Sequence, residues 1–489
     1  MKQIKNANVT KEIFDDLDQY LEEAIIRRKI PALGISIVVD NEIIYAKGFG
    51  FRNIQSKEKT TENTIFPIGS STKSFTSTAI ALLVQDGLLE WDKPIRECCS
   101  KFRFKDSYVS ENVTIRDILG HRTGLPGHDF VWYGFESDLT YLDKIQYLDA
   151  NKPFRTTFQY CNILFGAAAD LIEYLTGGSY YKFIQERILN PLGMNRTFQS
   201  REEVWKEDDY AKLYVEDREK IVEASDIDLK FGRGSGNINS TAVDMAKYLR
   251  FHLNKGKVED KELVSEENLV QTHLPTTIQQ STLLNDILPE KNLVHYPSYA
   301  LGWKCESYRG YRLISHAGSY PGCCHIGGFL PDLNIGIDIL TNTLESFLGT
   351  LLHYHIIDRF LGLEQIDYVE VDEQIFSFMK NNREKQKQVH EKEQVEKISY
   401  SHPLEDYTGR YRHPAYSDFE FAYSNGELLA KFGIHTCEIK HENNETFAVK
   451  LDLMQQSILV TFEKNQKGFI NGLRIKTEPT LEPVFFRKC

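Results

Sequence analysis

The stretch TIFPIGSSTKSFTSTAIALLVQDGLLEWDKPI, residues 64–95, joins a polar helix start to a long apolar helix. Ser70 and Lys73 stand three positions apart in it, so on a helix their side chains lie on one face and can meet. A serine hydroxyl is a poor nucleophile until a base takes its proton, and a lysine that burial keeps partly neutral can be that base. Gly87 is typical of a helix end. The stretch therefore predicts that Ser70 is a nucleophile, with a helix N-cap as its alternative role.

The Ser-x-x-Lys pattern alone does not single out Ser70, because it recurs in the chain. The other matches are Ser56–Lys59, Ser179–Lys182 and Ser377–Lys380. Two further motifs follow Ser70 in a fixed order. The segment FQYCNILFGAAADLIEYLTG contains Tyr160-x-Asn162 and leads into a predicted helix, and LISHAGSYPG contains His316-x-Gly318 at a predicted strand end. The three motifs together favour Ser70 over the other matches.

In this order, Ser-x-x-Lys, Tyr-x-Asn and His-x-Gly resemble the signatures of the serine β-lactamase and penicillin-binding-protein superfamily. The resemblance is to its class C β-lactamase-like branch of D,D-peptidases and esterases. Three more segments are similar to stretches of that family: IRDILGHRTGLPGHD at 115–129, ILNPLGM at 188–194 and GSGNINSTAVDMAKYL at 234–249. The resemblance covers residues 10–360.

The resemblance implies a role for each matched residue. Ser70 attacks the substrate carbonyl, and Lys73 and Tyr160 share the proton transfers. Asn162 hydrogen-bonds the lysine and the substrate amide. The backbone N–H groups of Ser70 and Ser319 form the oxyanion hole, where the loss of one donor typically costs ~10²–10³ in rate.

The His-x-Gly motif is matched twice, at His316-x-Gly318 and at His325-x-Gly327. We favour His316 and Gly318 as substrate-binding residues, because a strand leads directly into them and GSYPG follows, as the family pattern implies. His316 stands where many β-lactamases carry lysine. Because histidine is mostly neutral at pH 7, recognition of a β-lactam carboxylate should be weaker. The same variant in family peptidases and esterases favours those activities.

Other motif matches are interpreted as structural. The Tyr-x-Asn match at Tyr423 lies in a predicted hairpin, and the Ser-x-Asn matches at Ser110 and Ser235 are interpreted as caps in loops. Glu186 mimics the deacylating glutamate of class A β-lactamases, but it runs straight into the PLGM turn and is not expected to be catalytic. The aromatic run FVWYGF, residues 130–135, either lines a cleft or packs locally, and local packing is favoured.

Strands are predicted near both ends of the first 365 residues. A helix at 10–28 precedes LGISIVV and EIIYAKGF, which flank an Asp-Asn turn, and strands return in YRLISHAG and GGFLPDLNIGIDILTN. The middle, residues 115–290, is mostly helical. The predicted fold class is therefore α/β (α+β): an antiparallel sheet flanked by helices with an inserted helical region, of the β-lactamase and transpeptidase type.

Three parts are expected along the chain: a serine hydrolase domain at 1–365, a charged linker at 366–400 that is helical or disordered, and a small antiparallel β-barrel at 401–489. The last part resembles the lipocalin-like barrel attached to some archaeal peptidases of the family. That resemblance implies a separate domain that covers the cleft or mediates oligomerisation. The sequence leaves the oligomeric state open, and a homo-oligomer is one alternative.

Composition narrows the class of protein further. The chain has 489 residues, a formal net charge of -12 and a pI of about 5.7, which argues against nucleic-acid binding and against attraction to anionic membranes. The N-terminus shows no apolar signal segment, and no stretch reaches the roughly 18 apolar residues of a membrane span. The eight cysteines show neither C-x-x-C nor zinc-ligand spacing, so free thiols and a cytoplasmic location are expected.

The sequence thus predicts a serine hydrolase that forms an acyl-enzyme and acts on small peptides, including ones with D-residues, or on esters. We expect no metal and no organic cofactor. A β-lactamase is the alternative enzyme. The alternative of another class is a catalytically inactive relative that uses the pocket for binding or scaffolding.

Overall fold

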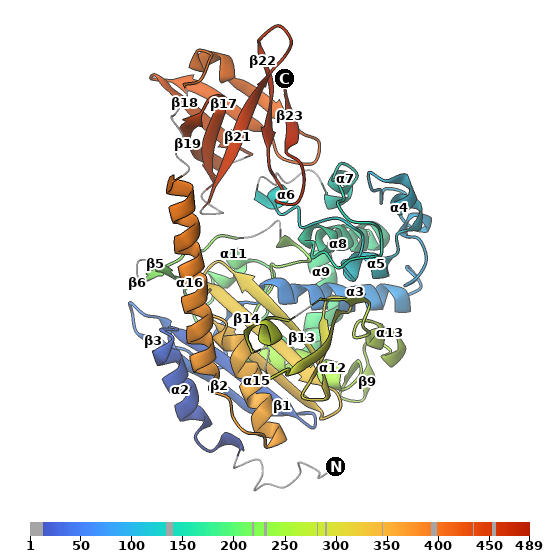
Figure 1. Cartoon of the computed structure of the whole chain (residues 1–489). Coiled ribbons are helices and arrows are strands. Elements are labelled where there is room, and N and C mark those ends of the chain that lie inside the picture. Colours follow the sequence, from blue (N-terminus) through green and yellow to red (C-terminus); the bar gives the residue numbers. More distant parts are fainter. Residues whose placement is uncertain are drawn as a thin grey trace. The chain divides into compact units, whose positions relative to one another are not determined.

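The computed structural model describes residues 13–133, 140–217, 220–228, 232–280, 282–288, 291–344, 346–392, 399–433, 435–451 and 456–489 (Figure 1). Contacts between residues divide the chain into two compact units. Unit 1 comprises Met1–Leu89 and Thr176–Arg383, and unit 2 comprises Glu90–Leu175 and Glu384–Cys489. Each unit is therefore built from two stretches that lie far apart in the sequence.

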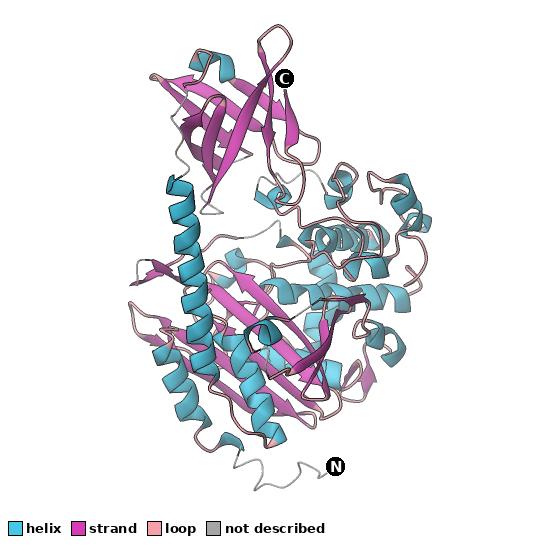
Figure 2. Ribbon diagram, in the orientation of Figure 1, coloured by secondary structure: helices cyan, strands magenta, loops and turns pink. Residues whose placement is uncertain are grey.

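Unit 1 contains a nine-stranded antiparallel sheet in the order β10-β11-β12-β13-β14-β15-β1-β2-β3 (Figure 2). Its strands are β1 Ala32–Val39, β2 Glu42–Asn53, β3 Glu58–Lys59, β10 Thr277–Ile278, β11 Val294–Tyr299, β12 Lys304–Tyr308, β13 Tyr311–Tyr320, β14 Cys323–Leu330 and β15 Ile335–Thr341. Strand β1 pairs with β15, with Ile35 opposite Ile339. The N-terminal and late strands thus form one sheet, as the sequence predicted.

Helices cover both faces of this sheet, and β1 is consequently buried along its whole length. Ile35 and Ile37 share a core with helices from both ends of unit 1. On the opposite face, a Cβ added to Gly34 would lie 3.8 Å from Ala242. The helices of the first face are α2 Leu17–Arg27, α15 Leu348–Leu361 and the start of α16 Tyr368–Lys392, and that of the second is α12 Ala242–Leu253.

The remaining elements of unit 1 include the helix that carries the Ser-x-x-Lys motif. That helix, α3 Thr72–Gln85, is buried over most of its length and follows the 3₁₀ turn η1 Gly69–Ser71. The others are β4 Phe66–Pro67, α9 Tyr180–Ile184, η3 Gln185–Leu189, α10 Asn190–Leu192, α11 Arg201–Val204, β5 Tyr214–Asp217, β6 Lys220–Glu223, β7 Asn239–Ser240, β8 Lys257–Val258, β9 Lys261–Glu262, α13 Glu266–Gln271 and α14 Leu283–Ile287.

Unit 2 begins with a helical region: η2 Ile95–Glu97, α4 Ser107–Asn112, α5 Ile115–Leu119, α6 Phe130–Tyr133, α7 Tyr141–Ile145 and α8 Asn162–Thr176, whose last residue belongs to unit 1. Asp117 organises the loops of this region. Its carboxylate completes a capping box with Thr114 and accepts hydrogen bonds from Arg122 and Arg155.

A closed eight-stranded barrel completes unit 2. Its strands are β16 Gly409–Arg412, β17 Phe419–Ser424, β18 Glu427–Phe432, β19 His435–Asn443, β20 Thr446–Leu451, β21 Gln456–Lys464, β22 Ile470–Ile475 and β23 Val484–Lys488, preceded by η5 Leu404–Tyr407. Aromatic rings meet across its interior: Phe462 of β21 contacts Phe421 of β17, with centroids 5.0 Å apart, and Tyr411 of β16, at 5.4 Å. Packing of these rings stabilises the barrel core.

Within unit 2, the barrel packs on the helical region through Phe130 of α6. The ring of Phe130 is buried and lies 4.8 Å, between centroids, from Phe432 and 5.7 Å from Tyr416. Phe130 is therefore a packing residue, but its partners lie in the barrel, far away in the sequence, so this packing is not the local packing that the sequence favoured for the run. Residues 134–135 of the run lie outside the described residues.

The fold class is as predicted: a mixed α/β fold with a large antiparallel sheet and helices, followed by a β-barrel. The charged segment at 366–400 contains the 25-residue helix α16. Among the described residues, no helix is long and apolar enough to cross a membrane.

Candidate active site

Ser70 lies in η1, and Lys73 lies one turn further along, in α3. Ser70 is half-buried and Lys73 is fully buried. Lys73 Nζ donates to the backbone oxygen of Ser235, 2.8 Å away, so the amine is held in one place. The Ser235 hydroxyl donates to the backbone oxygen of Gly232 at 3.2 Å, within the same turn. The backbone contact with Lys73 has no signal in the sequence pattern.

The glycine-rich stretch at 232–238 is tied to α3 by further hydrogen bonds. Thr76 Oγ1 donates to the backbone oxygen of Gly234, 2.7 Å away, and Thr72 Oγ1 accepts from the N–H of Ile238 at 3.1 Å. These bonds fix the carbonyl that binds the lysine relative to the helix that carries it.

Strand β13 lies directly against the turn that carries Ser70. A Cβ added to Gly318 would lie 1.8 Å from the oxygen of Ile68 and 2.9 Å from the N of Ser70. A Cβ added to Gly69, whose φ is +48°, would lie 2.7 Å from the N of Ser319. Only glycine permits this backbone approach at both positions. The structure thus brings together the backbones of Ser70, Gly318 and Ser319.

His316 is enclosed between neighbouring groups and is 6% exposed. Its Nδ1 donates to the oxygen of Ala317 at 2.6 Å, and its Nε2 lies 2.9 Å from the hydroxyl of Tyr299. Burial, together with the nearby Lys73, lowers the pKa of His316 to about 3. His316 is therefore neutral at pH 7, and its Nε2 accepts a hydrogen bond from the hydroxyl of Tyr299.

Tyr160 and Asn162 belong to unit 2, where His121 and Asp129 hold them. His121 Nδ1 accepts a hydrogen bond from the N–H of Cys161 at 3.1 Å, and its ring lies 4.5 Å from that of Tyr160. Asn162 Nδ2 donates to Asp129 Oδ1 at 2.9 Å. The segment IRDILGHRTGLPGHD thus contacts all three residues of the Tyr-x-Asn motif.

The sequence prediction did not include His121 or Asp129. The resemblance of their segment to a family stretch was a signal for His121, since the histidine belongs to the matched pattern. Asp129 carried no such signal, because its contact joins residues 33 positions apart.

The barrel contacts the same segment within unit 2. Glu478 Oε2 accepts a hydrogen bond from the N–H of His128 at 3.1 Å, and His128 Nδ1 lies 3.1 Å from the hydroxyl of Tyr416. Burial lowers the pKa of His128, so the imidazole is neutral at pH 7. Barrel side chains therefore bind the residue next to Asp129, which in turn binds Asn162.

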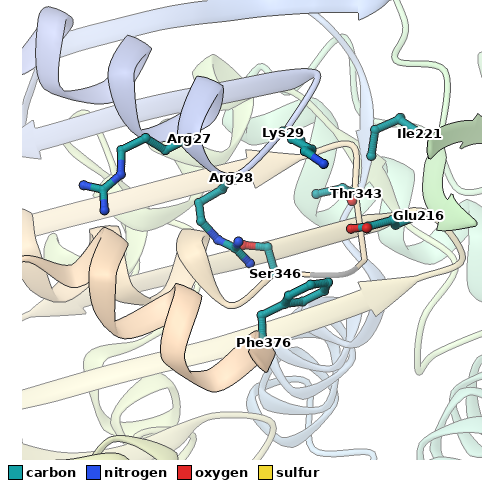
Figure 3. A pocket seen from close by; sticks show the side chains of 8 residues that line it. All are labelled: Arg27, Arg28, Lys29, Glu216, Ile221, Thr343, Ser346 and Phe376. Carbon is teal, nitrogen blue, oxygen red and sulfur yellow. The ribbon is translucent and has the colours of Figure 1, made fainter. Parts of the chain in front are cut away.

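A pocket lies elsewhere in unit 1, at the end of α2 (Figure 3). It is lined by Arg27, Arg28, Lys29, Glu216, Ile221, Thr343, Ser346 and Phe376, none of which is a predicted site residue. Two of its arginines pair with carboxylates of α16: Arg27 with Glu373 at 2.9 Å, and Arg28 with Asp372 at 2.5 Å. These pairs tie α2 to α16. Within the described ranges, no group of three His, Cys, Asp or Glu side chains could hold a metal ion.

The sheet, the helix with Ser-x-x-Lys and the adjoining His-x-Gly strand define a protein of the β-lactamase and penicillin-binding-protein class. A family model described as Beta-lactamase matches residues 17–358, and the chain belongs to that family. A second model, described as a domain of unknown function (DUF3471), matches residues 393–488. The resemblance inferred from the sequence is thereby confirmed.

Two fungal relatives carry the name unguisins hydrolase. The one from Aspergillus campestris is 29% identical over 98% of this chain and 93% of its own length. The one from Aspergillus violaceofuscus is 29% identical over 72% of this chain, which spans only 65% of that protein.

Solved structures show the same fold. The octameric penicillin-binding protein homologue from Pyrococcus abyssi matches 97% of this chain and 99% of its own, with a TM-score of 0.61 and 23% identity. The D-amino acid amidase from Ochrobactrum anthropi SV3 matches 73% of this chain and 98% of its own, with a TM-score of 0.56 and 22% identity.

Proposed function

We propose that the protein is a serine hydrolase that forms an acyl-enzyme on Ser70 and cleaves small peptides, including ones with D-residues, or esters. The observation that carries the proposal is the setting of Lys73: a fully buried amine one turn from a half-buried serine, donating to the backbone oxygen of Ser235. Removing a lysine from water favours its neutral form, which is the form that accepts a proton.

The roles follow from this setting and from the family signatures. Ser70 Oγ attacks the carbonyl carbon of the substrate while its proton passes to Lys73, and Tyr160 takes part in delivering a proton to the leaving group. The N–H groups of Ser70 and Ser319 are the proposed donors to the oxyanion. Gly318 supports this assignment, since only glycine lets its strand come so close to the N of Ser70.

Peptide and ester substrates are favoured over β-lactams by the state of His316. A neutral histidine whose Nε2 accepts a hydrogen bond from the Tyr299 hydroxyl offers no positive charge to a β-lactam carboxylate. Two relatives named hydrolases and a structural neighbour named an amidase agree with cleavage of acyl bonds. A β-lactamase is therefore the second candidate.

The test combines covalent labelling with a substrate screen. A fluorophosphonate probe and a fluorescent penicillin are applied to the wild type and to Ser70→Ala, and a library of D- and L-peptide amides, esters and cephalosporins is screened. We expect labelling of the wild type alone, with the highest kcat/KM on an amide or ester. Equal labelling of Ser70→Ala, or no labelling of the wild type, would support a binding protein. A much higher kcat/KM on cephalosporins would support the β-lactamase.

We also propose that the chain forms a homo-oligomer. The Pyrococcus abyssi homologue, which is named as octameric, matches this chain over its barrel as well as over its hydrolase part. Sedimentation velocity of the full chain tests this, and a monomer at micromolar concentration would contradict it.

A further inference from the structure

Three buried side chains behind the turn of Ser70 form a chain of hydrogen bonds. Ser71 Oγ lies 2.7 Å from His325 Nδ1, and His325 Nε2 lies 2.7 Å from Asp338 Oδ2. Ser71 belongs to η1, His325 to β14 and Asp338 to β15, so three elements meet here. The order of groups is that of a serine, histidine and aspartate catalytic triad. We call these three residues the buried relay.

The buried relay is not a second catalytic triad. Ser71 is 3% exposed. Its hydroxyl is hydrogen-bonded to His325 and to the backbone oxygen of His316, 3.0 Å away. A nucleophile must reach a substrate carbonyl, and Ser71 Oγ has no open side from which to do so. The function of the relay must therefore be exerted on its neighbours.

The relay is hydrogen-bonded directly to β13, the strand of the proposed oxyanion hole. The Ser71 hydroxyl joins η1, which carries Ser70, to the backbone of His316 in β13, which leads into Gly318 and Ser319. A displacement of that strand would move the N–H of Ser319 relative to Ser70. Displacements of about 1 Å in such a site can cost ~10²-fold in rate.

The number of hydrogen atoms in the relay explains why Ser71 is bound by a histidine that is itself bound by an acid. A serine hydroxyl has one hydrogen, and when His316 O accepts it, His325 Nδ1 must be the donor to Ser71 Oγ. His325 Nε2 and Asp338 Oδ2 then share one proton between them. By binding Nε2, Asp338 thereby favours the state of His325 in which Nδ1 is protonated and donates to Ser71 Oγ. The Ser71 hydroxyl hydrogen is then left to bind His316 O.

The surroundings of Asp338 agree with a carboxyl group that keeps this proton. Asp338 is fully buried, and among the described residues its Oδ1 has no hydrogen-bond partner. An unpaired carboxylate oxygen would be costly there. Burial also raises the pKa of Asp338.

The second His-x-Gly match now has a structural reason. A Cβ added to Gly327 would lie 2.7 Å from Asp338 Oδ2 and 3.2 Å from the ring of His325. Glycine at this position leaves room for the relay. The motif at His325-x-Gly327 therefore belongs to the buried relay, whereas His316-x-Gly318 lies on the strand that contacts the turn of Ser70.

We propose that Ser71, His325 and Asp338 are positioning residues for the hydrolase: they hold the turn of Ser70 against the strand of Ser319. This inference rests on the proposed function. It goes beyond that function because it gives a structural role to three residues that do not contact the substrate in the proposed mechanism.

The first test removes the hydroxyl at the head of the relay. Ser71→Ala is compared with Ser77→Ala, which removes an equally buried hydroxyl of α3 that has no hydrogen-bond partner among the described residues. Loss of a buried hydrogen bond predicts that Ser71→Ala lowers kcat and the rate of fluorophosphonate labelling about tenfold, with KM changed less than twofold. Ser77→Ala should stay within twofold of the wild type in both rates.

The second test changes the acid without changing its shape. In Asp338→Asn the amide N–H can donate to His325 Nε2 and preserve the ring state, so labelling should stay within threefold of the wild type. In Asp338→Leu no donor remains, and labelling should fall about tenfold. Circular dichroism checks that each variant is folded before its rates are compared.

The outcomes separate the two proposals. Wild-type labelling rates in folded Ser71→Ala would overturn the positioning role, as would Asp338→Asn and Asp338→Leu being equally slow. If Asp338→Leu does not fold, Ser71→Ala against Ser77→Ala decides. Failure of the proposed function shows itself differently, as labelling of Ser70→Ala or no labelling of the wild type.

Discussion

The turn of Ser70 in unit 1 and the Tyr-x-Asn segment in unit 2 carry signatures of one family, yet they are held by different means. Behind Ser70 stand fully buried groups: Lys73 on a backbone oxygen, and the relay that begins at Ser71. Asn162 is held instead by Asp129, an exposed carboxylate. The residue next to Asp129, His128, is bound by barrel side chains.

This difference predicts how each region responds to change. Buried hydrogen bonds lie in a medium of low polarity, so removing one partner leaves an unpaired group and costs more than at the surface. Exposed bonds are weakened by water and salt. The substitution of the buried Lys73 should therefore have the largest effect, and substitutions at the exposed bond of Asp129 to Asn162 should have smaller effects that depend on ionic strength.

The largest effect is expected at Lys73. Lys73→Met keeps the length of the side chain but removes the base, and kcat/KM on an ester substrate should fall by about 10³ or more. The matched control is Lys182→Met in the Ser179–Lys182 match, where the lysine is 68% exposed. That variant should retain wild-type activity. A loss of less than tenfold in Lys73→Met would remove the lysine from the mechanism.

A second large effect is expected in the acid sensitivity of unfolding. Because the pKa of His316 is lowered to about 3 in the folded protein and is about 6.5 when unfolded, the unfolded state binds the extra proton between these values. His316 therefore reduces stability as pH falls from 6.5 toward 3. Replacing it by glutamine should reduce the loss of unfolding free energy between pH 7 and pH 4.5 by about 2–3 kcal/mol.

Urea unfolding of the wild type and His316→Gln at both pH values measures this change. Equal pH dependence in the wild type and His316→Gln would mean that His316 takes up a proton as readily when folded as when unfolded.

The sequence predicted the parts of the structure that local patterns encode. Strands from both ends, the inserted helices, the barrel and the spacing of Ser70 and Lys73 follow from periodicity, turn residues and motif order. The strand of His316 contacts the Ser70 turn through Gly318, and the preference for His316 over His325 as a substrate-binding residue stays a prediction.

What could not be predicted depends on register between strands. His325 was visible only as a competing motif, because its partners lie 254 positions before it and 13 after it. Antiparallel pairing places His325 opposite Gly318 and Gly327 opposite Asp338. A slip of one residue would turn each of these side chains to the other face of the sheet. The relay is thus a product of the fold rather than of any local pattern.

On the unit 2 side, the largest effect is expected at His121. His121→Ala removes the acceptor for the N–H of Cys161 and the ring that packs on Tyr160, and kcat should fall about 30-fold, since a buried N–H loses its partner. His121 has a φ of +54°, a conformation that asparagine tolerates. His121→Asn keeps an acceptor oxygen and should recover at least half of that loss on a logarithmic scale. Steady-state kinetics on the substrate found in the screen decide, and equal loss in both variants would contradict a role for the acceptor.

The smallest effect is expected where the barrel meets the Tyr-x-Asn segment. Asp129→Asn weakens the bond to Asn162, and Glu478→Gln weakens the bond from the N–H of His128; each should lower kcat/KM about threefold. Because both bonds involve a carboxylate near the surface, the wild type should lose part of its advantage over each variant when salt is raised from 0.05 to about 0.5 M. The control is Glu427→Gln, at an exposed carboxylate of β18, which should have no effect. An effect of Glu478→Gln as large as that of Lys73→Met would show that the barrel takes part in the chemistry itself, and the contrast between the two regions would then be wrong.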